Sequence, residues 1–190
     1  MPAPLFSAQV AESRQSLSRL EEANLQPQLE RAIEALRAAL TEGNPVLVCG
    51  NGGSAADAQH IAGELVGMFL KQRRALNVRA LGTDGSVITA WANDVSYETV
   101  FARQVEAYGR PGGVLWAIST SGNSKNVLEA AVAAKKQQMP VVALTGEGGG
   151  ALSEHADILL AVPSRLTPRI QEMHIMLYHY ICERVEAQFS

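Results

Sequence analysis

The chain has 190 residues, of which 47% are hydrophobic and 18% are charged, and its formal net charge is -3. This length and composition suit one globular domain with a sizeable core and exclude an intrinsically disordered chain. A general nucleic-acid binder is also disfavoured, because its affinity would come from many contacts between basic side chains and phosphates. No apolar run approaches the roughly 18 residues of a membrane span, and the N-terminus lacks the pattern of a secretion signal, so we expect a cytoplasmic protein.

Two helices are predicted before the first strand. Residues 5–24 have a helical pattern, and a second helix opens with Pro27 in its first turn. Gly43 ends this helix, whose apolar positions recur at helical spacing, at Leu29, Ile33, Leu36 and Leu40. We expect this extension, residues 1–43, to cover the edge of a sheet or to pack against another subunit.

The remainder, residues 44–190, alternates short apolar runs with longer helical segments. Strands are predicted at 45–49, 76–81, 114–118, 140–144 and 158–162, and helices at 54–68, 85–92, 96–108, 125–138 and 168–188. Strands separated by helices imply right-handed crossovers and a parallel sheet that is covered on both faces. We therefore predict a single domain, residues 1–190, of the α/β class: a flavodoxin-like three-layer sandwich with a mainly parallel five-stranded sheet flanked by helices, plus the N-terminal helices.

The two cysteines, Cys49 and Cys182, each lie in an apolar run and neither belongs to a CxxC pair. We expect free buried thiols rather than a disulfide or a zinc–thiolate site. Free thiols are typical of proteins in a reducing compartment.

Two predicted strands end in polar turns that open helices, which is where open α/β sheets bind ligands. The turn after the third strand carries four hydroxyls, from Ser119, Thr120, Ser121 and Ser124. Together with the free N–H groups of a helix N-terminus, they favour a phosphate site. The alternative is that one serine caps the helix and the others are solvated.

The turn after the first strand reads Gly50-Asn51-Gly52-Gly53-Ser54 and matches neither GxxxxGK[ST] nor GxGxxG. Its glycines can be explained by a tight turn alone. Asn51 and Ser54 nevertheless add hydrogen-bonding side chains that a turn does not require.

His60 and Glu64 follow on the next helix, four residues apart and therefore on one face. Such a pair can bind a metal or transfer protons, although a surface interaction is the commoner explanation. The C-terminal helix adds Gln171, Glu172, His174 and His179.

These segments together resemble one family across nearly the whole chain. The matching segments are CGNGGSAADAQHIAGEL (49–65), AND (92–94), ISTSGNS (118–124), ALTGEGGG (143–150) and RIQEMHIMLYH (169–179). They resemble the phosphoheptose isomerases, or sedoheptulose 7-phosphate isomerases, of the sugar isomerase (SIS) superfamily. The resemblance implies conversion of sedoheptulose 7-phosphate to D-glycero-D-manno-heptose 7-phosphate, toward ADP-heptose for lipopolysaccharide. It also implies a homotetramer with active sites at subunit interfaces and one Zn²⁺ per subunit.

The resemblance assigns roles to particular residues. It implies a substrate-binding set of Asn51, Gly52, Gly53, Ser54, Asp94, Ser119, Thr120, Ser121, Ser124 and Gln171, with the serine turn on the phosphate. It implies that zinc is held by His60, Glu64, Gln171 and His179. Glu64 is then the base for an enediol proton transfer, and His179 serves ring opening or oxygen protonation. Gln171 and His179 are about 12 Å apart along a helix axis, so His174 competes as a ligand, but we expect it to pack or contact a partner.

The sequence departs from the family where many relatives have Arg and Asp, at Met68 and near Pro168. We expect one of the nearby basic residues to replace the missing Arg, namely Lys71, Arg73, Arg74, Arg165 or Arg169. A non-enzymatic relative, the DnaA initiator-associating protein, is the main alternative, but it resembles an isomerase without the Glu and His that this chain has at Glu64 and His179. A sugar-phosphate sensor is a third reading, and it would not need the His/Glu cluster.

Overall fold

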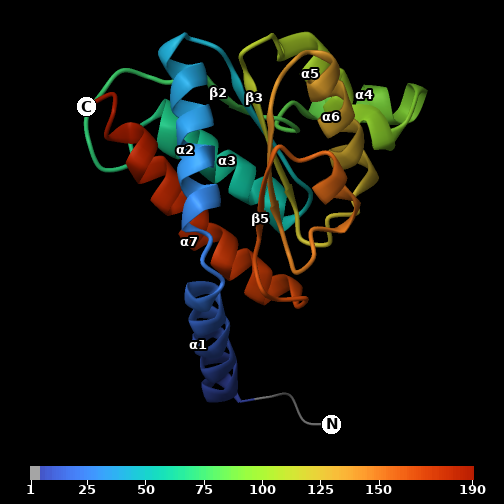
Figure 1. Cartoon of the computed structure of the whole chain (residues 1–190). Helices are drawn as coiled ribbons and strands as arrows, with labels where there is room; N and C mark the ends of the chain where they lie inside the picture. The colour runs from blue at the N-terminus through green and yellow to red at the C-terminus, as the bar shows by residue number, and fades with distance from the viewer. Residues whose placement is uncertain (1–4) are drawn as a thin grey trace.

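The computed structural model describes residues 5–190 and has a five-stranded sheet at its centre (Figure 1). The strands are β1 (Val46–Cys49), β2 (Val78–Ala80), β3 (Val114–Ser119), β4 (Val141–Thr145) and β5 (Ile158–Ala161). All neighbouring pairs are parallel and the order is β2-β1-β3-β4-β5. This confirms the predicted parallel α/β sandwich, and the chain direction across the sheet reverses between β1 and β3.

Helices cover both faces of the sheet. One face packs against α2 (Gln26–Thr41), α3 (Gly53–Val66) and α7 (Thr167–Glu186), and the other against α5 (Val100–Tyr108) and α6 (Lys125–Lys136) (Figure 1). In β1, Val46 and Val48 join the first core and Leu47 and Cys49 the second. Because side chains alternate along a strand, a continuous apolar run fills both cores.

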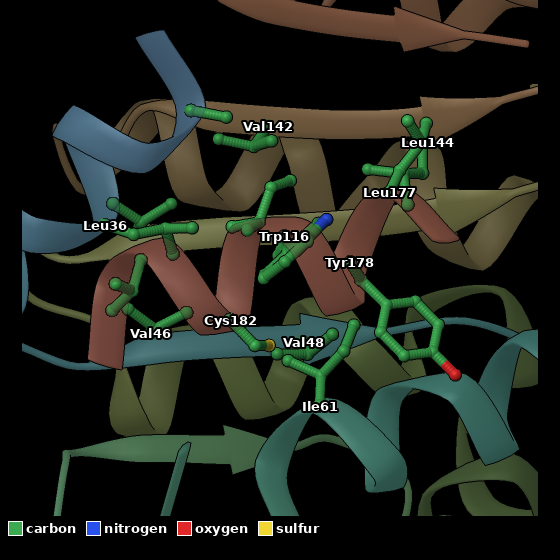
Figure 2. Close-up of a cluster of buried hydrophobic side chains, with 14 of the residues drawn as sticks. Leu36, Val46, Val48, Ile61, Trp116, Val142, Leu144, Leu177, Tyr178 and Cys182 are labelled. Carbon is green, nitrogen blue, oxygen red and sulfur yellow. The ribbon is translucent and has the colours of Figure 1, made fainter. Parts of the chain in front are cut away.

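Figure 2 shows the core beneath α2, α3 and α7. Trp116 of β3 is fully buried there, among side chains from β1, β4 and the three helices. This packing fixes α3 and α7 against the same sheet face, and the two helices also contact each other. The packing therefore fixes the positions of outward-pointing residues on α3 relative to those on α7.

The first helix, α1 (Phe6–Glu22), projects from the body of the fold (Figure 1). Its main anchor is the buried Arg169 of α7, which donates to the Gln9 carbonyl at 2.9 Å and to the Ser13 hydroxyl. Both N-terminal helices were predicted, and α2 keeps its apolar stripe against the sheet. The first four residues of the predicted extension lie outside the described residues, and the division into 1–43 and 44–190 stays a prediction.

The segment after β2 differs most from the sequence prediction. The helix α4 (Gly85–Asp94) continues through Asn93 and Asp94, and the chain leaves it at Val95, where 3₁₀ helix η1 (Tyr97–Thr99) follows. Polar residues of low helix propensity are tolerated in a last turn, which is why the predicted break at 93–94 was wrong. A second 3₁₀ helix, η2 (Gly150–Glu154), begins at the last residue of the glycine run that was predicted to interrupt the chain. Within residues 5–190, no helix is long and apolar enough to cross a membrane.

Candidate functional site

Two polar turns lie side by side at the carboxyl edge of the sheet, after β1 and after β3. Between these two strands the sheet order reverses, which in open α/β sheets creates the crevice where ligands bind. The side-chain amides of Asn51 and Asn126 join the two turns at 2.8 Å. Asn126 is buried in the first turn of α6 and was not singled out from the sequence, since a lone Asn there reads as an ordinary helix-start residue.

The serine turn, residues 119–124, is shaped by Gly122, whose φ of 67° favours glycine. The hydroxyl oxygens of Ser119 and Ser124 lie 3.1 Å apart. Ser124 is the N-cap residue of α6, yet within the described chain its side chain makes no capping bond to the helix. The capping alternative therefore does not account for Ser124, and the first N–H groups of α6 stay available to an anion.

The other hydroxyls of this turn differ in their surroundings. Ser121 is exposed and accepts a hydrogen bond from the backbone N–H of Asn123 at 3.1 Å. The carbonyl of Thr120 accepts from the N–H of Gly146 at 2.9 Å, which ties the serine turn to the end of β4. The turn is thus held in place by backbone bonds, and within residues 5–190 the Thr120 hydroxyl forms no hydrogen bond.

The glycine turn brings α3 and α7 together. A Cβ atom added at Gly53 would overlap the side-chain amide of Gln171, so glycine lets this amide lie against α3 in its present position. Ser54 is buried beside it and Gly52 has a φ of 56°. From the sequence, a tight turn alone could explain these glycines. In the structure Gly53 also permits the close approach of a side chain from another helix.

Asp94 and Tyr97 lie on the segment that follows β2. The Asp94 carboxylate is exposed at the end of α4 and accepts from the Asn93 amide at 2.7 Å. The Tyr97 hydroxyl donates to the side-chain oxygen of Asn51 at 3.1 Å, so this segment reaches the glycine turn through Tyr97. Tyr97 was not predicted from the sequence, because an isolated tyrosine in a polar stretch carries no pattern.

A second cluster lies farther along α3. The Nε2 atom of His60 is 2.9 Å from Oε1 of Glu64 and 3.4 Å from Nε2 of His179. The three side chains can offer ligand atoms that all lie within 4.8 Å of one another. Burial lowers the pKa of His179, and the neighbouring His60 lowers it further, so His179 is neutral near pH 7. Two imidazoles and a carboxylate form a donor set that suits zinc.

The fourth predicted ligand, Gln171, is not part of this cluster within the chain. It lies against Gly53, seven residues before His60 on α3, which corresponds to about 10 Å along the helix axis. The assignment of Gln171 as a metal ligand stays a prediction, because within one chain its side chain lies against Gly53. His174, the competing ligand, is fully buried and its Nε2 lies 3.1 Å from the carbonyl of Thr145, which confirms the expected packing role.

Two of the basic residues expected to replace the missing Arg are committed elsewhere. Arg73 donates to the carbonyl of Glu64 at 2.6 Å and pairs with the buried Glu186 at 3.4 Å. Arg169 is buried and is engaged with α1 and with Glu172 at 2.8 Å. Both guanidinium groups support helices in this chain, and which of the five basic residues replaces the missing Arg stays a prediction.

The chain is similar to known proteins in both sequence and structure. The SIS domain family matches residues 9–146. The phosphoheptose isomerase of Crocosphaera subtropica is 51% identical over 160 residues, which are 84% of this chain and 82% of the relative. The solved phosphoheptose isomerase of Neisseria gonorrhoeae is 44% identical, with a TM-score of 0.89 over 95% of this chain and 96% of that chain. That of Francisella tularensis is 38% identical, also with a TM-score of 0.89 and 95% coverage of both chains.

These similarities extend over nearly the whole chain. They include the two polar turns and the cluster of His60, Glu64 and His179. They give no support to the DnaA-associated alternative. The chain belongs to the phosphoheptose isomerase family of SIS-domain proteins.

Proposed function

We propose that the chain is an isomerase that converts sedoheptulose 7-phosphate to D-glycero-D-manno-heptose 7-phosphate, for ADP-heptose and lipopolysaccharide synthesis. The observation that carries the proposal is the spacing of the two clusters. The glycine and serine turns are joined through Asn51 and Asn126, and His60, which contacts Glu64 and His179, lies about 10 Å from Gly53 along α3. An extended seven-carbon sugar phosphate has a length of this order.

The serine turn is the proposed phosphate site. The hydroxyls of Ser119 and Ser124 face each other, and the N-terminus of α6 adds backbone donors and the positive end of the helix dipole. Asn51, Ser54 and the nearby Asp94 segment are proposed to contact the sugar hydroxyls. A phosphate bound at the serine turn would hold C1 and C2 of the sugar beside Glu64 and His179. Holding the reacting groups in position in this way lowers the entropic part of the barrier.

Glu64 is the proposed base. Its carboxylate takes a proton from C1 of the ketose, the electron pair forms the C1–C2 double bond of an enediol, and the same carboxylate returns a proton to C2. His179 is neutral near pH 7, so it can accept a proton from one substrate oxygen and return it to the other. Atoms and electrons balance within the substrate, and no external reductant is needed.

We propose one Zn²⁺ per subunit, held by His60, Glu64 and His179, because their side chains converge and match the donors that zinc prefers. Zinc bound there would supply a Lewis acid for the carbonyl oxygen. Gln171 is the proposed fourth ligand, and in an assembled protein it could come from a neighbouring subunit.

We further propose a homotetramer with active sites at subunit interfaces. Support comes from apolar side chains that α1 and α7 leave exposed; the most exposed are Phe6 at 82% and Met176 at 51%. Patches of this kind on projecting helices commonly mark contacts between subunits. We place the reaction in the cytoplasm, which agrees with two buried cysteines that are free thiols within the described residues.

The direct test is to incubate the purified protein with zinc and sedoheptulose 7-phosphate in D₂O. Formation of the aldose, with deuterium at C2 from exchange of the enediol proton, is expected. Absence of aldose at any zinc concentration would refute the proposal. Binding of the sugar phosphate without turnover would instead favour a sensor.

A further inference from the structure

The hydroxyl group of Tyr178 lies between two groups of α3. Its oxygen is 2.9 Å from Nδ1 of His60 and 3.4 Å from a carboxylate oxygen of Asp57. Tyr178 comes from α7, and in Figure 2 its hydroxyl oxygen points away from the cluster of labelled apolar side chains. The three residues form a chain of polar contacts behind the His60 imidazole, on the side opposite Glu64.

The burial of Asp57 in this set of contacts costs folding free energy. Its side chain is 7% exposed, and its second oxygen, Oδ2, has no partner within residues 5–190. Burial raises the pKa of Asp57, which shows that the surroundings disfavour the carboxylate. A buried carboxylate with an unsatisfied oxygen lowers stability, and an apolar residue in its place would pack without that cost. A functional role accounts for the carboxylate better than packing does.

The Tyr178 hydroxyl can serve both neighbours because it is at once a donor and an acceptor. When His60 uses Nε2 toward the Glu64 carboxylate, Nε2 carries the proton and the hydroxyl can donate to Nδ1. When Nε2 is needed as a ligand, the ring proton moves to Nδ1. The hydroxyl then accepts from Nδ1 and donates to Oδ1 of Asp57.

We propose that Tyr178 and Asp57 are positioning residues that hold His60 in the tautomer with Nε2 free for a metal ion. The inference rests on the proposed metal site of His60, Glu64 and His179. Metal-binding histidines commonly donate their second N–H to a carboxylate, which fixes the tautomer and the orientation of the ring. Here a tyrosine hydroxyl stands between the histidine and the carboxylate.

Zinc affinity tests the proposal, measured by competition with a chromophoric chelator. Tyr178→Phe removes one oxygen atom and keeps the ring in its contacts with His60 and His179. We expect it to weaken zinc binding about 10- to 100-fold. Tyr180→Phe is the matched control, because that hydroxyl is on the same helix but contacts Gln26 and Arg184. The control variant should bind zinc as the parent protein does.

Asp57 gives a second comparison. Asp57→Asn keeps an oxygen that accepts from Tyr178, so it should retain most of the zinc affinity, whereas Asp57→Ala should lose it to the same extent as Tyr178→Phe. In zinc-loaded parent protein, ¹⁵N NMR should find the His60 proton on Nδ1 in a hydrogen bond. In zinc-loaded Tyr178→Phe that hydrogen-bonded signal should be absent. A role in stability alone would change the unfolding midpoint and leave both readouts unaltered.

The outcomes separate this inference from the proposed function. If the parent protein binds zinc and Tyr178→Phe binds it equally well, the positioning role is wrong while the isomerase stands. If the parent protein does not bind zinc, the metal site and this inference both fail. If zinc binding responds as expected but no aldose forms from the heptulose phosphate, the inference holds and the proposed reaction is wrong.

Discussion

The Nε2 atoms of His60 and His179 lie 3.4 Å apart, although the two residues are separated by 119 positions in the chain. Two ring nitrogens at this distance can share one metal ion. Figure 1 shows α3 and α7 on the same face of the sheet, where the two helices contact each other.

Removal of metal should therefore abolish turnover. We expect protein that has been dialysed against a chelator to lose isomerase activity, and added Zn²⁺ to restore it. His60→Ala should lower the zinc affinity and the activity together, because it deletes a ligand. Full turnover by protein that is shown to be metal-free by elemental analysis would remove zinc from the mechanism.

Substitution of Ser124 tests the phosphate site. Ser124→Ala deletes one hydroxyl of the pair with Ser119 and should weaken sugar-phosphate binding by about tenfold, which is the value of one charge-assisted hydrogen bond. The change should appear in KM more than in kcat, since the hydroxyl is remote from the reacting carbons. Thr41→Ala, an exposed hydroxyl at the end of α2, is the control and should leave KM unaltered. An unchanged KM in Ser124→Ala would place the phosphate elsewhere.

The buried carboxylate of Glu186 should make stability depend on pH. It accepts from the backbone N–H groups of Phe69, Leu70 and Lys71 at 2.7 to 2.9 Å. Burial acts to raise its pKa, but these bonds and Arg73 outweigh burial and hold the pKa below its usual value of 4.5. A depressed pKa means that the stabilisation is present above about pH 4.5 and is lost as the pH falls through the folded-state value.

Glu186→Gln should accordingly lower the free energy of unfolding by about 2 kcal/mol at pH 7. The variant should also lose less stability than the parent protein on acidification below pH 4.5. Urea unfolding at pH 7 and at pH 3.5 measures both quantities. Equal losses in the two proteins would show that Glu186 is not the group responsible.

The exposed side of α1 should be needed for assembly. Phe6→Asp combined with Val10→Asp places charge on two exposed apolar positions and should reduce the mass measured by light scattering from a tetramer to a smaller species. A pair of polar changes at Gln15 and Ser18, which are exposed on the same helix, serves as the comparison. A tetramer that survives the Asp substitutions would place the interface elsewhere.

Much of the fold follows from periodicity. The buried runs around Val48, Trp116 and Leu144 are continuous because both faces of the sheet are covered, and the helices between them require parallel pairing. The end of α4 was misplaced because its last residues, Asn93 and Asp94, have a weak helical preference that is tolerated in the last turn of a helix.

The site was predictable where its residues form a local pattern, as His60 and Glu64 do at a four-residue spacing. Partners from distant segments left no such signal. Asn126, Tyr97 and Tyr178 acquire their places through folding, since each contacts a residue that lies 46 or more positions away. The engagement of Arg73 and Arg169 with helix carbonyls was equally hidden, because a basic residue in a sequence does not show which acceptors surround it.

The central claim is that Glu64 moves the proton between C1 and C2. The measurement that tests it most directly is turnover of sedoheptulose 7-phosphate by Glu64→Gln, compared with sugar-phosphate binding by the same variant. The account predicts that turnover falls by at least about a hundredfold while binding stays within a fewfold of the parent protein. Turnover at the parental rate in folded Glu64→Gln would contradict it.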